Sequence, residues 1–93
     1  MQAWIDGWFY DTDTATLIAH NSYWDGSSWF RSGRNSYLYK SPEGNFFLYH
    51  TTMWEGERDY IQPVDLQLAK YCYQVLPIKE MDYKTSFSTN PLP

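Results

Sequence analysis

The stretch YLYKSPEGNFFLYH, residues 37–50, decides the fold of this chain. Both of its ends are rich in aromatic residues, a composition typical of β-strands. Between them, Pro42 presets the second position of a type I turn, and Gly44 can take the left-handed conformation that completes a bulged hairpin loop. Aromatic residues on both sides supply the cross-strand pairs that stabilise a sheet. We therefore predict an antiparallel hairpin with strands at 37–40 and 46–50.

A second hairpin is predicted near the N-terminus. Residues 4–5 and 8–10 are short aromatic runs that flank Asp6-Gly7, a dipeptide that favours a type I′ turn. Further along, residues 59–62 have the composition of another strand, which we expect Pro63 to end. The irregular stretch 21–36 carries several turn signals and is predicted to be a loop that holds one short strand at most.

The first predicted helix spans residues 15–20. It follows Asp11-Thr12-Asp13-Thr14, and Asp and Thr often precede helices because their side-chain oxygens accept hydrogen bonds from free backbone N–H groups. Ala15, Ile18 and Ala19 would then form its buried stripe, since residues three and four apart share one helix face.

A second helix is predicted over residues 66–75, with Asp65 as its N-cap and Pro77 beyond its end. Its spacing places Leu68, Cys72 and Val75 on one face, which we expect to be buried. One more short extended segment should precede the C-terminal tail.

The predicted order of elements is β-β-α-β-β-β-α, which indicates an α+β fold: a small antiparallel sheet with two short helices packed on one face. A chain of 93 residues is long enough for one domain only. We expect this compact domain to cover residues 1–83. The polar segment 84–93 should be a flexible C-terminal tail.

The net charge of −4 excludes more functions than it identifies. A protein that binds nucleic acid directly needs a basic surface, and so does a polybasic membrane anchor. The single cysteine, Cys72, cannot form an internal disulfide, which suits a reducing compartment. No apolar run approaches the roughly 18 residues of a membrane-spanning helix. We therefore expect a cytoplasmic protein without membrane or direct nucleic-acid contact, either a monomer or a weak homodimer.

Nothing in the sequence predicts catalysis, a metal site or a cofactor. The segment around Asp11 and Asp13 resembles the aspartyl-nucleophile loop of haloacid-dehalogenase-type phosphatases, but Ala15 breaks the motif and the chain is too short for that fold. The histidines, His20 and His50, lack the spacing of metal ligands. No histidine lies near Cys72 in the sequence, so we expect this thiol to be structural.

The segment WEGERDY, residues 54–60, is the strongest candidate for binding. It sets three carboxylates and two large aromatic residues around a glycine, in a predicted exposed loop. Aromatic anchors rimmed by charge are typical of protein–protein hot spots. We predict these partner-binding residues: Trp54, Glu55, Glu57, Asp59 and Tyr60. The alternative is a solvated loop whose rings fold back on the core.

Three blocks of the chain together resemble a family of short bacterial and mobile-element proteins. The first is "WFYDTDTA" at 8–15, which contains the family signature YDTDTA; the second is the hairpin "LYKSPEGNFFLY" at 38–49. The third is "IQPVD" at 61–65, followed by Ala69-Lys70. Order and spacing agree over residues 4–75. The Gly-rich stretch that follows the family's hairpin is replaced here by residues 51–57, and the C-terminal tail is longer, so partner specificity cannot be transferred.

The resemblance implies a non-catalytic function, because some proteins of this kind resemble anti-CRISPR inhibitors carried by phages and mobile genetic elements. It therefore implies a small acidic inhibitor that docks on a basic surface of a Cas effector and blocks nucleic-acid binding or activation. The alternative is a small bacterial accessory domain that binds a non-CRISPR host protein or self-associates through its aromatic residues.

Overall fold

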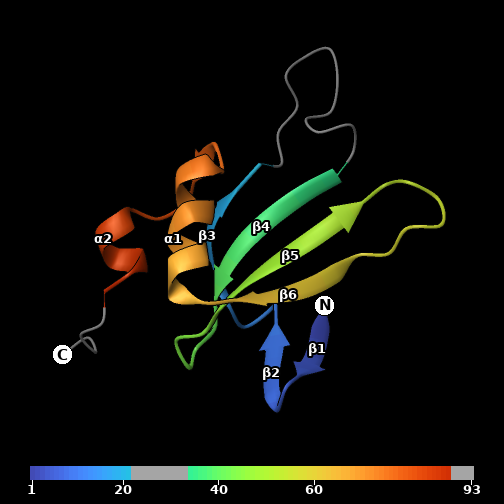
Figure 1. Cartoon of the computed structure of the whole chain (residues 1–93), viewed down its shortest axis with the longest axis horizontal. Coiled ribbons are helices and arrows are strands. Elements are labelled where there is room, and N and C mark those ends of the chain that lie inside the picture. The colour runs from blue at the N-terminus through green and yellow to red at the C-terminus, as the bar shows by residue number, and fades with distance from the viewer. Residues whose placement is uncertain (22–33, 89–93) are drawn as a thin grey trace.

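The computed structural model describes residues 1–21 and 34–88 and shows an α+β arrangement (Figure 1). Five strands form one antiparallel sheet in the order β6-β5-β4-β3-β7, and two more form a separate hairpin, β1-β2. The elements are β1 (Gln2–Ile5), β2 (Trp8–Asp11), β3 (Thr16–His20), β4 (Arg34–Lys40), β5 (Phe46–Thr52), β6 (Tyr60–Val64), α1 (Leu66–Val75), β7 (Ile78–Lys79) and α2 (Tyr83–Ser86).

The central hairpin, β4-β5, confirms the first prediction. Tyr37 pairs with Tyr49 and Leu38 with Leu48. In the turn, the Gly44 N–H donates to the Ser41 carbonyl over 2.9 Å, and Gly44 has the expected left-handed conformation, with φ of 91°. The strands are longer than predicted, since they begin at Arg34 and end at Thr52.

The N-terminal hairpin is also confirmed. Asp6 and Gly7 have φ angles of 51° and 81°, both positive as a type I′ turn requires. The hairpin packs on the face of the large sheet that is remote from the helices. There Tyr10 of β2 meets Phe47 of β5 edge to face, with ring centroids 5.2 Å apart.

The predicted first helix is wrong, because residues 16–20 form strand β3. Asp11 does not cap a helix: its Oδ1 accepts from the Asp13 N–H over 2.9 Å, which closes a tight turn that leads into the strand. Pairing with β4 satisfies the backbone better than an isolated helix of two turns would. An irregularity in register between Leu17 and Ala19 lets Ile18 and Ala19 both enter the core, which explains the helix-like pattern.

Replacing Asp11 by alanine should lower the free energy of unfolding by about 1–2 kcal/mol, because the turn loses an acceptor that is itself buried. Asp13 is the matched control. It is exposed and makes no side-chain hydrogen bond within the described residues, so Asp13→Ala should change stability by about 0.5 kcal/mol at most. Urea denaturation of both variants checks this, and equal losses would contradict the turn assignment.

Strand β6 corrects a second expectation. Pro63 does not end the strand, which continues to Val64. Because β6 is an edge strand of the sheet, the missing N–H of proline costs no ladder hydrogen bond there. A proline also blunts an edge that would otherwise pair with another chain.

Helix α1 has the predicted bounds, and its N-cap is confirmed, since Asp65 Oδ1 accepts from the Leu68 N–H over 2.8 Å. The predicted buried face is wrong in part. Ala69 and Cys72 are buried, whereas the side chains of Leu68 and Val75 are 39% and 55% exposed. The small Ala69 and Cys72 face the sheet, which turns the larger apolar residues outward.

Successive residues of β5 supply the two sides of the core. Phe46 and Leu48 pack with α1 and Leu38, while Phe47 packs beneath the N-terminal hairpin. The predicted extended segment after α1 is the short strand β7. Residues 84–88, expected to belong to a tail, lie in or beside α2, where Ser86 is fully buried and the Phe87 ring lies 5.2 Å from Phe46. The loop predicted at 21–36 is wrong at its end, because residues 34–36 belong to β4. Residues 22–33 of that loop and residues 89–93 lie outside the described part of the chain.

Candidate interaction surface

The segment predicted to bind a partner is the connection between β5 and β6, residues 53–59, here called the β5–β6 loop. It extends beyond the end of the sheet, away from both helices (Figure 1). Every residue of the loop is exposed, and so is Tyr60 at the start of β6. The loop therefore has the accessibility that an interface needs.

Glu57 ties the loop to strand β4. Its carboxylate accepts two hydrogen bonds from the Arg34 guanidinium, from Nε over 3.0 Å and from Nη2 over 2.5 Å. It also accepts from the Thr52 hydroxyl over 2.7 Å. These bonds from Arg34 and Thr52 hold the pKa of Glu57 below its usual value. A bidentate pair of this kind fixes orientation as well as distance.

Asp59, the last residue of the loop, ties it to strand β5. Its Oδ1 accepts from the Thr52 N–H over 3.0 Å, and its Oδ2 accepts from the Tyr49 hydroxyl over 3.2 Å. Burial and the nearby Asp59 carboxylate together raise the pKa of the Tyr49 hydroxyl. Within the loop, the Glu57 N–H donates to the Trp54 carbonyl over 3.2 Å, and Gly56 takes a left-handed φ of 87°. Hydrogen bonds therefore order the loop, both internally and against the neighbouring strand.

The aromatic and apolar side chains of this region face the solvent. Met53, Trp54 and Tyr60 are 66%, 51% and 53% exposed. The Arg34 guanidinium lies 5.6 Å from the centroid of the Trp54 ring, a cation–π contact. Glu55 is exposed and makes no hydrogen bond or ion pair in the described structure. Of the five predicted residues, Trp54, Glu55 and Tyr60 are presented outward, while Glu57 and Asp59 hold the loop.

Acid should loosen this loop. The pKa of Glu57 is lower in the folded protein than in the unfolded chain, so its contribution is present above the unfolded value and is lost as the pH falls through the folded one. Amide NMR signals of the loop should therefore shift and broaden on acidification. At neutral pH, Glu57→Gln should already give the loop signals that the wild type gives in acid. If the variant still shows the full acid transition, the transition belongs to a group other than Glu57.

A cavity of about 390 Å³ lies at the base of the β5–β6 loop; among the residues that line it are Arg34, Ser36, His50, Thr52, Glu57, Arg58 and Tyr60. Two of the lining residues are in contact, since the Ser36 hydroxyl and His50 Nδ1 are 2.9 Å apart. His50 Nε2 also lies 2.9 Å from Gln62 Oε1. Residue-by-residue reading of the sequence missed this cluster. The signal was present in the predicted hairpin, whose register places Ser36 opposite His50.

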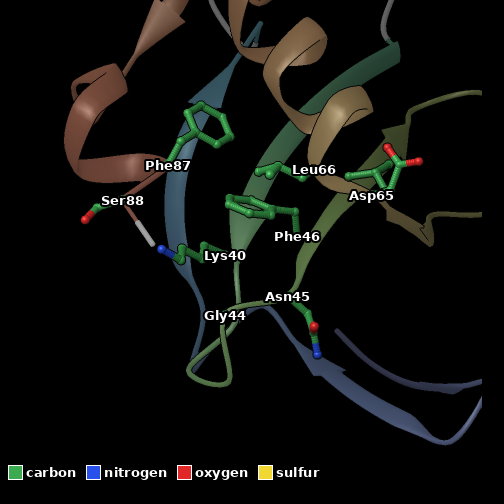
Figure 2. Close-up of a pocket in the computed structure, with 9 residues that line it drawn as sticks. Lys40, Gly44, Asn45, Phe46, Asp65, Leu66, Phe87 and Ser88 are labelled. Atoms are coloured by element: carbon green, nitrogen blue, oxygen red, sulfur yellow. The ribbon is translucent and has the colours of Figure 1, made fainter. Parts of the chain in front are cut away.

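A second cavity, of about 430 Å³, lies between the β4–β5 turn and the two helices. Figure 2 shows Phe46, Leu66 and Phe87 grouped close together, with Lys40 near Ser88. Lys40 Nζ donates to the Ser86 carbonyl over 3.3 Å, so the cation is already used to hold α2. Asp65 caps α1, so both charged side chains that line this cavity have structural partners, and we assign it a packing role.

The other residues that the sequence singled out lie apart from the β5–β6 loop. His20 Nε2 lies 2.8 Å from the Glu80 carboxylate, on the opposite side of β4 from His50. Cys72 is buried, and burial raises the pKa of its thiol. Within residues 1–21 and 34–88, no group of three or more His, Cys, Asp or Glu side chains is placed to hold a metal ion.

The helices of the described chain are too short or too polar to cross a membrane. Compared with known family models, curated proteins and solved structures, the chain shows no match. The geometry of the surface and the sequence resemblance are therefore the two indications of function.

Proposed function

We propose that this protein is a non-catalytic inhibitor that binds another protein through the β5–β6 loop. One observation carries the proposal: a loop that is held to strands β4 and β5 by side-chain hydrogen bonds presents large apolar side chains to solvent. A loop that only connected two strands would not need this bonding. Trp and Tyr are the residue types most enriched at binding hot spots.

The bonding within the loop also bears on affinity. Ordering a flexible segment on binding costs free energy, and a segment that is already ordered avoids much of this cost. Arg34 on β4, together with Tyr49 and Thr52 on β5, supplies that order before any partner arrives. The proposed interface is therefore preorganised.

The charges of the region refine the expected partner. Glu57 and Asp59 are engaged inside the protein, so Glu55 is the loop carboxylate that remains to contact a basic group. The net charge of −4 still favours a basic partner at long range. We therefore expect apolar anchors to supply most of the affinity. Added salt should slow association but should leave most of the binding free energy.

The partner that we propose is a Cas effector with a basic surface, on which the protein blocks nucleic-acid binding or activation. The support is the resemblance of residues 4–75 to small proteins of phages and mobile elements, together with the exposed loop and the acidic charge. A phage-plating assay tests this: the protein is expressed in strains that carry different active CRISPR systems. Restored plaque formation in one strain is expected, and no restoration in any strain would refute inhibition of the systems tested.

Self-association is a second candidate, favoured by the outer face of α1. Leu68, Tyr71 and Val75 fall at helical spacing and are 39%, 61% and 55% exposed. Lys70 is the only charged residue within the helix. A second copy could bury this face without bringing like charges together. Sedimentation of the wild type and of Tyr71→Glu separates the two candidates. A dimer built on α1 would dissociate in the variant, whereas an interface built on the β5–β6 loop would be unaffected.

A further inference from the structure

The side chains of Ser36, His50 and Gln62, on three neighbouring strands, are linked by successive contacts and are here called the row. Ser36 on β4 lies directly opposite His50 on β5. Gln62 on β6 lies diagonally next to His50, because the register partner of His50 is Tyr60. Two contacts of 2.9 Å link the row, from Ser36 Oγ to His50 Nδ1 and from His50 Nε2 to Gln62 Oε1.

The partners of His50 fix where its proton lies. The amide oxygen Oε1 of Gln62 can only accept, so the neutral ring carries its hydrogen on Nε2. Nδ1 then has a free lone pair and accepts from the Ser36 hydroxyl. A hydroxyl that donates to a basic ring nitrogen, with the ring oriented by a third group, is the arrangement of an activated nucleophile.

Ser36 and His50 line the cavity of about 390 Å³ at the base of the β5–β6 loop. The His50 ring is supported by Tyr60, with ring centroids 4.6 Å apart. Two guanidinium groups line the same space. Arg34 is paired with Glu57, whereas the ion pairs of the described residues do not include Arg58. Arg58 is therefore available to neutralise a negative charge in the cavity.

We infer that Ser36 is a nucleophile that reacts with short carboxylic esters. Ser36 Oγ bonds to the acyl carbon while His50 Nδ1 takes the hydroxyl proton, and the ester C–O bond breaks as the alcohol leaves with that proton. Water then gives a proton to Nδ1 and attacks the acyl carbon. The bond to Oγ breaks, the proton returns to Ser36, and a carboxylic acid is released.

The expected reaction is slow. A positioned general base contributes about 10²–10⁴-fold to a rate. The backbone N–H of Ser36 does not add to this, because it donates to Asn21 Oδ1 over 2.8 Å and cannot bind an oxyanion. Without this donor, both the formation and the hydrolysis of the acyl–Ser36 ester should be slow. This reaction at Ser36 is separate from the proposed inhibition, which acts by binding alone and uses no catalysis.

The test uses a fluorophosphonate probe on the intact protein, in which the Ser36 oxygen displaces fluoride from phosphorus. Peptide mass spectrometry should find a one-to-one adduct on Ser36. His50→Gln should slow its formation by about 100-fold or more, since the general base is lost. Ser88→Ala, an exposed serine outside the row, should react at the wild-type rate. No adduct on Ser36, or an equal rate in His50→Gln, would overturn the inference.

Gln62 supplies a second variant in case His50→Gln does not fold. Gln62 is exposed, so Gln62→Glu should fold, and its carboxylate would keep the orientation of His50 and stabilise the charged ring. Labelling of Ser36 should then be at least as fast as in the wild type, whereas Gln62→Leu should slow it. If both Gln62 variants label at the wild-type rate, the row has only a structural role.

Discussion

Replacing Phe47 by alanine should lower the free energy of unfolding by about 3–5 kcal/mol, the largest stability change that we expect from one substitution. Phe47 is fully buried, although it lies on the face of the sheet that carries no helix. Its ring stacks on Tyr39 at a centroid distance of 5.3 Å and meets Tyr10 edge to face at 5.2 Å. The deletion leaves a cavity beneath the N-terminal hairpin and removes its main apolar contact.

Chemical denaturation measures this loss, and Tyr71→Ala is the control. Tyr71 is also aromatic, but it is 61% exposed on α1, so its removal should cost about 0.5 kcal/mol or less. Hydrogen exchange of the β1 and β2 amides should rise most in Phe47→Ala, because those strands lose their support. A Phe47→Ala protein as stable as Tyr71→Ala would refute the two-sided core.

Replacing Trp54 by alanine should weaken partner binding by about 2 kcal/mol, or roughly 30-fold in Kd. Trp54 projects from the β5–β6 loop and is half-exposed in the free protein, so its apolar surface remains to be buried in a complex. The fold should tolerate this change, because the ion pair of Arg34 with Glu57 still holds the loop. Loss of binding with an unchanged melting temperature is the expected combination.

Trp4 provides the matched control for this prediction. It is 75% exposed on the N-terminal hairpin, more than Trp54, so exposure alone would make it the better anchor. Its ring rests on Phe9 at a centroid distance of 4.9 Å, and it lies outside the β5–β6 loop. Trp4→Ala should bind the partner as the wild type does. If Trp4→Ala binds weakly and Trp54→Ala binds normally, the interface is on the hairpin.

The elements predicted correctly are those whose signals are local. The turns at Asp6-Gly7 and Ser41–Asn45 specify their conformation through positive φ angles, and Asp65 caps α1 through its own side chain. The helix predicted at 15–20 failed for a non-local reason. Residues 16–20 are held in a strand by pairing with β4, and the local sequence carries no trace of that partner.

In the candidate site, too, the features with local signals were predicted and those that depend on distant residues were not. The sequence located the exposed loop and its aromatic residues, but it could not assign roles to the carboxylates. Glu57 pairs with Arg34, which is 23 positions away in the chain, and no short-range pattern indicates this. The contact of Ser36 with His50 was within reach, since it follows from extending the predicted register of the central hairpin by one pair.

The most direct test of the central claim is a binding titration. The protein, its Trp54→Ala variant and its Trp4→Ala variant would each be titrated by calorimetry against the Cas effector of the CRISPR system that the plating assay identifies. We expect a complex of fixed stoichiometry, with a Kd about 30-fold weaker for Trp54→Ala and unchanged for Trp4→Ala. Equal affinities for the wild type and Trp54→Ala would contradict docking through the β5–β6 loop.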